Sequence, residues 1–170
     1  DEYGRLFTNE IYDPNFYKSG TVALEAERER IVGAFERFEP LNKLWGFKLY
    51  PQNEITLTRY GPGGMYLEDT GRVILLTYAD GQFKRQHPSH TPVHEGFHLG
   101  IEQQIVKKFS LSHWEKERIV DLGVLALCGD LLPGYEIQNK GDTRIDEFVS
   151  AGTIKILPQQ IERYVNKYPR

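Results

Sequence analysis

Apolar residues recur at helical spacing in the middle of the chain, beginning just after Pro92. Four of them are four residues apart and would share one face of an α-helix: Val93, Phe97, Ile101 and Ile105. Thr91 suits the N-cap of this helix, and Pro92 suits its first turn, where the missing N–H costs nothing. The pattern predicts a helix that is buried on this side and carries polar residues on an adjacent face.

Similar patterns predict helices on both sides of this segment. An amphipathic helix is expected over residues 21–38, with Pro40 as its stop. Ser112 and Glu115 have the spacing of a capping box, which predicts the start of another helix. A last helix is expected over residues 158–167.

Alternating apolar and polar residues predict β-strands between the first two helices. The expected strands are 45–49, 55–59, 73–79 and 82–85, with a tight turn at Asp80-Gly81 between the last two. Residues 1–20 are rich in Tyr, Asn, Asp, Pro and Gly and predict an irregular N-terminal arm. Strands followed by helices indicate an α+β fold, and no repeat or long linker divides residues 1–170, so we expect a single domain.

Composition excludes several classes of protein. A chain of 170 residues with 39% hydrophobic content can bury a core without disulfides. With 21 Lys+Arg against 24 Asp+Glu, the net charge is −3 and no basic stripe is present, so nucleic-acid binding is not expected. The longest apolar stretch, Ile119–Leu132, is interrupted by Asp121 and Asp130 and cannot span a bilayer.

Two further features concern the cellular environment. Cys128 is the single cysteine, so no intrachain disulfide is expected, and its position fits a buried helix face. A chain that begins at Asp1 instead of methionine is expected after processing or after artificial shortening. Removal of a signal peptide would favour a periplasmic or secreted location, and the compartment stays open.

The predicted central helix carries the HExxH pattern, with His94 and His98 four residues apart and Glu95 between them. Histidines at this spacing lie on one helical face, about 5–6 Å apart, so both imidazoles can bind one metal ion. The Glu95 carboxylate would reach a water molecule on that ion and not the ion itself. The pattern predicts a hydrolytic zinc site.

A third protein ligand is expected on the helix that Ser112 caps. Because Glu115 serves the capping box, Glu117 is left to complete a set of two histidines and one glutamate, with a fourth position open to water. Asp121 follows one helical turn later on the same face. Its carboxylate could accept the other ring N–H of a ligand histidine and so hold the tautomer.

In these five residues the chain resembles the gluzincin metallopeptidases, which share HExxH, a glutamate ligand on the following helix and often an acidic residue one turn later. The matching residues are His94, Glu95, His98, Glu117 and Asp121. The resemblance implies a zincin-like fold, in which a small antiparallel or mixed sheet packs on the HExxH helix and the C-terminal half is helical. It also implies an edge strand that receives extended peptide, and the hairpin 73–85 is the candidate for this edge. The alternative for the same residues is an ordinary hairpin that covers the core.

The resemblance covers residues 88–128, and the chain departs from the family at two places. Lys116, and not Asn, precedes Glu117. The Gly-x-Met-Glu-Asn stretch of the family's aminopeptidases is also missing, and residues 63–66 resemble it only superficially. Exopeptidase activity is therefore not implied.

Other residues compete for roles at the site. Glu147 is a rival third ligand, because its segment is similar to the glutamate helix of zincins with a longer spacing, and Asp142 or Thr143 would cap that short helix. Glu102 and Asp121 are further alternatives. A second metal site at His87 and His90 is an alternative to ordinary polar loop positions. The candidates for stabilising a tetrahedral intermediate are Tyr60, Tyr135 and Arg144.

The predicted function is that of a zinc-dependent endopeptidase acting on a peptide or protein substrate. Glu95 would take a proton from the attacking water and pass it to the leaving amine. Two alternatives stay open: a catalytically degenerate zincin that binds a protein partner through its cleft, and a zinc hydrolase of a non-peptide amide. The intact Glu95 favours catalysis, because a purely structural site has no use for that carboxylate.

Overall fold

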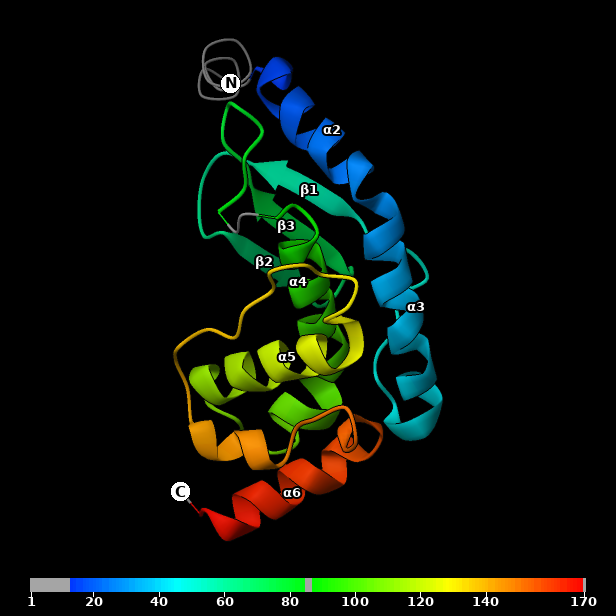
Figure 1. Cartoon of the computed structure of the whole chain (residues 1–170), viewed down its shortest axis with the longest axis vertical. Helices are drawn as coiled ribbons and strands as arrows, with labels where there is room; N and C mark the ends of the chain where they lie inside the picture. The colour runs from blue at the N-terminus through cyan, green and yellow to red at the C-terminus, as the bar shows by residue number, and fades with distance from the viewer. Residues whose placement is uncertain (1–12, 85–86, 170) are drawn as a thin grey trace.

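The structure is a computed structural model that describes residues 13–84 and 87–169. It has an α+β fold in which a three-stranded mixed sheet packs against a central helix and the C-terminal half is mostly helical, as predicted (Figure 1). Its longer helices are α2 (Lys18–Ala26), α3 (Arg28–Trp45), α4 (His90–Ile101), α5 (His113–Cys128) and α6 (Leu157–Lys167). The strands are β1 (Ile55–Thr58), β2 (Gly64–Leu67) and β3 (Arg72–Leu76).

The N-terminal helices differ from the prediction. Residues 1–12 of the predicted arm lie outside the described residues, and residues 14–20 are helical: Pro14–Tyr17 is a 3₁₀ turn that leads into α2. The single helix expected over 21–38 is two helices that meet at Glu27. They lie end to end along one side of the molecule (Figure 1).

Pro40 lies inside α3 and does not end it, so the predicted stop and the strand expected over 45–49 are both wrong. Phe38 and Leu41 are buried on either side of the proline, and their packing offsets the hydrogen bond that proline removes. The helix ends at Gly46, whose φ of 80° suits a left-handed C-cap.

The sheet has the order β1-β3-β2, which corrects the expected edge strand. β1 runs parallel to β3 and β2 runs antiparallel to it, so the strand expected over 73–79 is central. Of the predicted hairpin, the described residues keep the turn at Asp80-Gly81, where the Tyr78 N–H donates to the Gln82 carbonyl at 2.9 Å, and an isolated bridge between Thr77 and Phe83. The strand at the edge beside α4 is β2. It pairs with β3 at the place where the sequence predicted the strand 82–85.

Helix α4 is buried along its whole length and not on one side only. It begins at His90 with Ser89 as N-cap, two residues before the predicted cap. Aromatic rings approach its backbone closely: a Cβ added to Gly100 would lie 1.8 Å from the Phe47 ring. The apolar stripe of α4 packs with α3 and α5 in the main core, so the helix that carries HExxH is held from all sides. No helix in the described ranges is long and apolar enough to cross a membrane.

Helix α5 begins as predicted. The Ser112 backbone N–H donates to Glu115 Oε2 at 2.8 Å, and the Glu115 N–H donates to Ser112 Oγ, which completes the capping box. Because the capping box fixes the first turn of α5, it also determines which face of the helix carries Glu117. At the other end of the helix Cys128 is buried, and burial raises the pKa of its thiol to about 12.

Candidate metal centre

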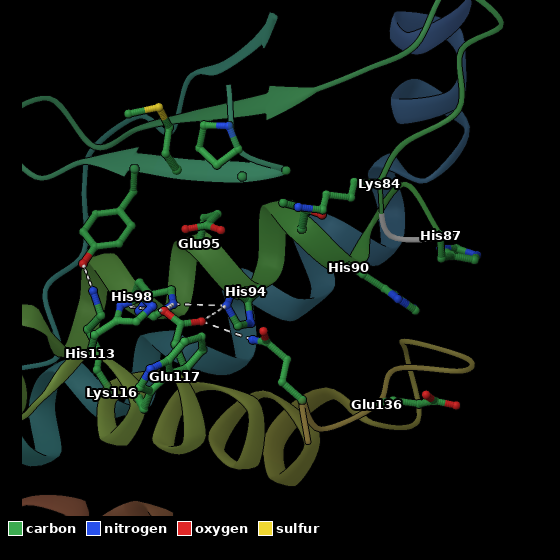
Figure 2. Close-up of a pocket in the computed structure, with 18 of the residues that line it drawn as sticks. Lys84, His87, His90, His94, Glu95, His98, His113, Lys116, Glu117 and Glu136 are labelled. Atoms are coloured by element: carbon green, nitrogen blue, oxygen red, sulfur yellow. Dashed lines mark hydrogen bonds and ion pairs between the residues drawn. The ribbon is translucent and has the colours of Figure 1, made fainter. Parts of the chain in front are cut away.

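Helix α4 presents its HExxH residues to a pocket of about 1060 Å³. The walls of this pocket come from β2, α4, α5 and the loop 133–138. Figure 2 shows Glu95 on the side of α4 that faces the strands, while Glu117 reaches from α5 toward His94 and His98. The pocket therefore brings together residues that are far apart in the sequence.

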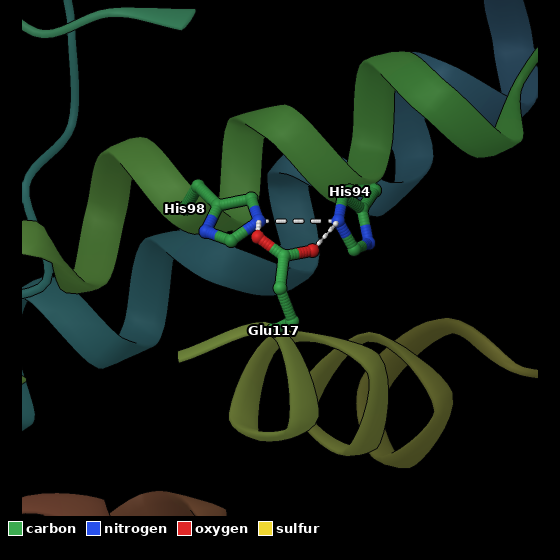
Figure 3. A group of neighbouring side chains, drawn as sticks. All are labelled: His94, His98 and Glu117. Carbon is green, nitrogen blue, oxygen red and sulfur yellow. Dashed lines mark hydrogen bonds and ion pairs between the residues drawn. The ribbon is translucent and has the colours of Figure 1, made fainter. Parts of the chain in front are cut away.

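His94, His98 and Glu117 form a group that could hold a metal ion (Figure 3). The two Nε2 atoms are 3.1 Å apart. Glu117 Oε2 lies 3.3 Å from His94 Nε2, and Glu117 Oε1 lies 3.2 Å from His98 Nε2. Both histidines are almost completely buried, at 2% and 1% exposure. Three donor atoms thus converge from two helices on one small volume.

These distances fit a zinc-sized ion. Zinc binds nitrogen and oxygen ligands at about 2.0–2.2 Å in a tetrahedral arrangement, which places neighbouring ligand atoms about 3.3 Å apart. The Nε2–Nε2 separation of 3.1 Å is close to that edge length, and each Nε2 lies 3.2–3.3 Å from a different oxygen of the Glu117 carboxylate. Two imidazoles and one carboxylate also make up the protein ligands of known catalytic zinc sites, which keep a fourth position open.

The far side of His94 is held by a hydrogen-bonded chain of buried groups. The Tyr135 hydroxyl donates to Asp121 Oδ1 at 2.9 Å, and His94 Nδ1 lies 2.8 Å from the same hydroxyl oxygen. Because the tyrosine proton goes to Asp121, the hydroxyl oxygen accepts from His94 Nδ1–H. Asp121 Oδ1 itself lies 3.2 Å from His94 Nδ1. This arrangement leaves the Nε2 lone pair directed at the ligand group.

The loop after α5 supplies a residue that the sequence analysis did not identify. Gln138 Nε2 donates to Glu117 Oε2 at 3.2 Å, and the Gln138 backbone N–H donates to Asp121 Oδ2 at 2.8 Å. Gln138 lies in an irregular segment without periodicity or a motif, so no sequence signal marks it. Tyr135 of the same segment was a candidate for stabilising a tetrahedral intermediate, and its hydroxyl instead lies between His94 and Asp121. The loop contacts both acidic residues of the site and thereby fixes their positions.

The surroundings keep the donor groups in the protonation states that a metal needs. Burial would raise the pKa of Glu117, but the close approach of His94 and His98 to its carboxylate outweighs it and holds this pKa well below its usual range. Burial lowers the pKa of His98 to about 4. The pKa of Asp121 is also lowered, because its contacts with His94, Gln138 and Tyr135 outweigh burial. The carboxylates are ionised and His98 is neutral at pH 7.

An aromatic ring lies against His98. Tyr66 of β2 stacks on the imidazole with ring centroids 5.2 Å apart and planes 16° apart. Its hydroxyl donates to Glu102 Oε2 at 2.7 Å and accepts from Lys116 Nζ at 3.0 Å. Burial and the Glu102 contact raise the pKa of Tyr66, so the phenol stays protonated. Glu102, one of the alternative ligands, is therefore engaged with Tyr66 and lies outside the group of three.

Glu95 lines the same pocket from the strand side of α4. Its side chain is buried, at 8% exposure, and a Cβ added to Gly64 of β2 would lie 2.5 Å from Glu95 Oε1. The same Cβ would lie 2.4 Å from Thr91 Cγ2. The carboxylate thus occupies space that only a glycine at position 64 leaves open.

The remaining sequence candidates lie elsewhere. Glu147 is exposed at the end of a 3₁₀ turn, Thr143–Glu147, and pairs with Lys167 at 2.9 Å. Arg144 pairs with Asp142, which caps that turn as predicted. Tyr60 is 67% exposed.

The other histidines do not add a second metal group within the described ranges. His90 Nε2 lies 3.1 Å from the Pro133 carbonyl oxygen, and His87 stacks on His90. His113 is exposed beside Glu117, with Nδ1 3.8 Å from Glu117 Oε1. In that part of the chain, His94, His98 and Glu117 are the single group with metal-binding geometry.

Comparison of the chain with protein-family models, with curated proteins and with solved structures finds no match. The class of protein is therefore defined by the fold and the site alone. The fold is α+β, and a His-His-Glu group that could hold a metal ion lies between α4, the HExxH helix, and α5.

Proposed function

We propose that this protein is a zinc-dependent endopeptidase in which His94, His98 and Glu117 hold the ion and Glu95 is the general base. The observation that carries the proposal is the convergence of two imidazole Nε2 atoms and one carboxylate at 3.1–3.3 Å, in a pocket that Glu95 also lines. A zinc ion bound there would polarise a substrate carbonyl and lower the pKa of water toward 7.

The residues of the chain divide the remaining work. Glu95 would take the proton of the attacking water and transfer it to the leaving amine. Asp121, through Tyr135 and by its own approach to His94 Nδ1, would hold His94 in the tautomer that binds metal. Gln138 would hold the Glu117 carboxylate in place.

The edge strand β2 supports a peptide as the substrate. The Leu76 N–H donates to the Gly63 carbonyl at 3.0 Å. In an antiparallel pair the hydrogen-bonded positions alternate, so the backbone groups of Gly64 and Tyr66 point away from β3. No other described strand pairs with this edge. An extended peptide could add to it and lie across the pocket between β2 and α5.

Two measurements test the proposal together. Elemental analysis should find about one zinc per chain in wild-type protein and none held stoichiometrically by His94→Ala. A mixed-peptide library should yield a cleaved sequence, and Glu95→Gln should lower its turnover by about 10²–10⁴-fold with zinc content unchanged. A metal-free wild-type protein after purification with zinc would refute the site. A Glu95→Gln variant that cleaves at the wild-type rate would refute the mechanism.

Wild-type protein that binds zinc but cleaves no peptide would favour the alternative, a metal-stabilised domain that binds protein partners through this pocket. The burial of Glu95 against Gly64 supports hydrolysis over that alternative, because a carboxylate has been placed in the pocket without serving as a ligand in the group of three.

A further inference from the structure

The two histidines of the metal group are supported in different ways. On the side away from the ligand group, His94 Nδ1 meets Tyr135 and Asp121. His98 Nδ1 is buried and has no hydrogen-bond partner among the described residues. Metal-binding histidines almost always use a hydrogen bond at the second ring nitrogen to fix their orientation. The ring of His98 needs another support.

The orientation of the imidazole ring determines where Nε2 points. The Nε2 lone pair lies in the ring plane, so rotation about the Cβ–Cγ bond turns it away from the point that it shares with His94 and Glu117. A flat group packed parallel to the ring opposes this rotation, because tilting the imidazole would drive its edge into that group. Tyr66 lies in this position, with its plane 16° from that of His98.

Tyr66 is itself fixed at its far end. Its hydroxyl donates to Glu102 Oε2 at 2.7 Å and accepts from Lys116 Nζ at 3.0 Å. Glu102 lies one turn beyond His98 in the continuation of α4, and Lys116 immediately precedes Glu117 on α5. The tyrosine ring is thereby connected to both helices that carry metal ligands.

We propose that Tyr66 is a positioning residue that holds His98 in its metal-binding orientation by stacking, in the place of the hydrogen bond that His98 Nδ1 lacks. This inference rests on the proposed metal site and does not depend on hydrolysis. It gives β2 a second role, because the strand proposed to receive the peptide also determines the position of one ligand.

The test compares three substitutions at position 66 in the full chain. Tyr66→Phe keeps the ring and removes the hydroxyl, Tyr66→Leu removes the ring, and Tyr66→Met fills the space with a flexible side chain. Tyr50→Leu is the matched control: Tyr50 is also half-buried beside the sheet, and its hydroxyl donates to the Glu68 carbonyl, away from the ligand group.

Zinc affinity should fall roughly 10–100-fold in Tyr66→Leu and Tyr66→Met, the range for residues that orient a metal ligand. Tyr66→Phe should stay close to wild type, and so should Tyr50→Leu. Bound cobalt provides the second readout: its visible absorption should change in the Leu and Met variants, since the His98 ligand is displaced, and should be preserved in Tyr66→Phe.

The outcomes separate this inference from the proposed function. Wild-type protein that binds neither zinc nor cobalt refutes the metal site itself. If wild type binds and Tyr66→Leu or Tyr66→Met matches its affinity and cobalt spectrum, the positioning role is wrong. Loss of affinity in Tyr66→Phe equal to that in Tyr66→Leu would also overturn it, because the hydroxyl contacts and not the stacked ring would then be responsible. Should Tyr66→Leu fail to fold, Tyr66→Met and Tyr66→Phe still decide between these results.

Discussion

Each of the three metal-ligand candidates is held by a different kind of contact. Glu117 lies between two histidines and also accepts from Gln138. His94 is held through hydrogen bonds, whereas the ring of His98 is stacked against Tyr66. Loss of a ligand removes a bond to the ion, and loss of a supporting residue only loosens one. Substitutions at these residues should therefore be graded in their effect on metal affinity.

The grading gives a first prediction. Glu117→Ala should weaken zinc binding by more than roughly 100-fold, since the loss of a ligand exceeds the usual cost of losing a supporting residue. Asp121→Asn should cost about 10–100-fold, because the amide supports His94 less well. Glu147→Ala, which removes an exposed partner of Lys167, is the control and should leave affinity unchanged. Competition with a fluorescent chelator measures all three, and the reverse order for Glu117 and Glu147 would contradict the ligand set.

Gly64 gives a second prediction at this scale. A Cβ at this position would lie 2.5 Å from Glu95 Oε1, so Gly64→Ala should displace the proposed base. We expect turnover to fall by about 10²–10⁴-fold while zinc content stays near wild type. Both quantities are measured on the same preparation.

Gly63→Ala is the matched neighbour, because its Cβ would meet the flexible Lys84 side chain, which can move aside. Its loss of turnover should be much smaller than that of Gly64→Ala. Equal losses in the two variants would mean that the strand, and not the position of Glu95, is sensitive to added bulk.

At the scale of elements, the sequence predicted what depends on local spacing. HExxH places two histidines on one helical face, and the Ser112 capping box fixes the first turn of α5 and with it the direction of Glu117. The sheet was harder to predict. Residues 61–64 have the composition of a turn, and β2 becomes a strand only by pairing with β3. Pairing between separate segments leaves no periodic signal in one of them.

The same distinction explains the contacts that the sequence did not reveal. Gln138 was not identified, and Tyr135 was named for another role, because both lie in an irregular loop where no periodicity shows which side chain faces a buried site. Pro40 was expected to end a helix on local grounds, and tertiary packing on both sides of it overrides that preference. Local rules located the proposed ligands, and long-range packing supplies the residues that hold them.

The C-terminal elements are joined by a cluster that predicts a pH dependence. Asp142 caps the turn Thr143–Glu147, and the one hydroxyl proton of Tyr164 in α6 is shared between Asp142 Oδ2 at 2.7 Å and Glu115 Oε1 at 2.9 Å. A hydrogen bond from Arg144 is the main cause that holds the pKa of Asp142 below its usual range, and Tyr164 adds to it against burial. The ionised carboxylate is the form that these contacts stabilise.

Because the folded-state pKa of Asp142 is below the unfolded value of about 3.9, its contribution to stability is present above that pH and is lost as the pH falls through the folded-state pKa. Asp142→Asn should therefore lower the urea midpoint of metal-free protein at pH 5–8, and the difference from wild type should shrink below about pH 4. Asp69→Asn, at an exposed position, is the control. A difference that does not decrease between pH 4 and pH 2 would show that the side-chain charge is not its source.

At the scale of the whole molecule, the metal group joins two helices that also share the main core. His94 and His98 belong to α4 and Glu117 to α5, so an ion held by all three would bind the folded state and not the unfolded chain. A ligand of this kind stabilises the fold by about 2.7 kcal/mol when its free concentration is 100 times its Kd. For a chain of this size, that corresponds to a rise in Tm of roughly 5–10 °C.

The last prediction follows from this coupling. Wild-type protein should melt roughly 5–10 °C lower in excess chelator than with saturating zinc, and adding zinc back should restore the higher Tm. His94→Ala should lose the zinc-dependent shift, because one ligand is removed. Glu95→Gln, on the same buried helix but outside the ligand group, should keep the full shift while losing turnover. Differential scanning calorimetry measures all of these, and a zinc-dependent shift that survives in His94→Ala would mean that zinc stabilises the protein from another site.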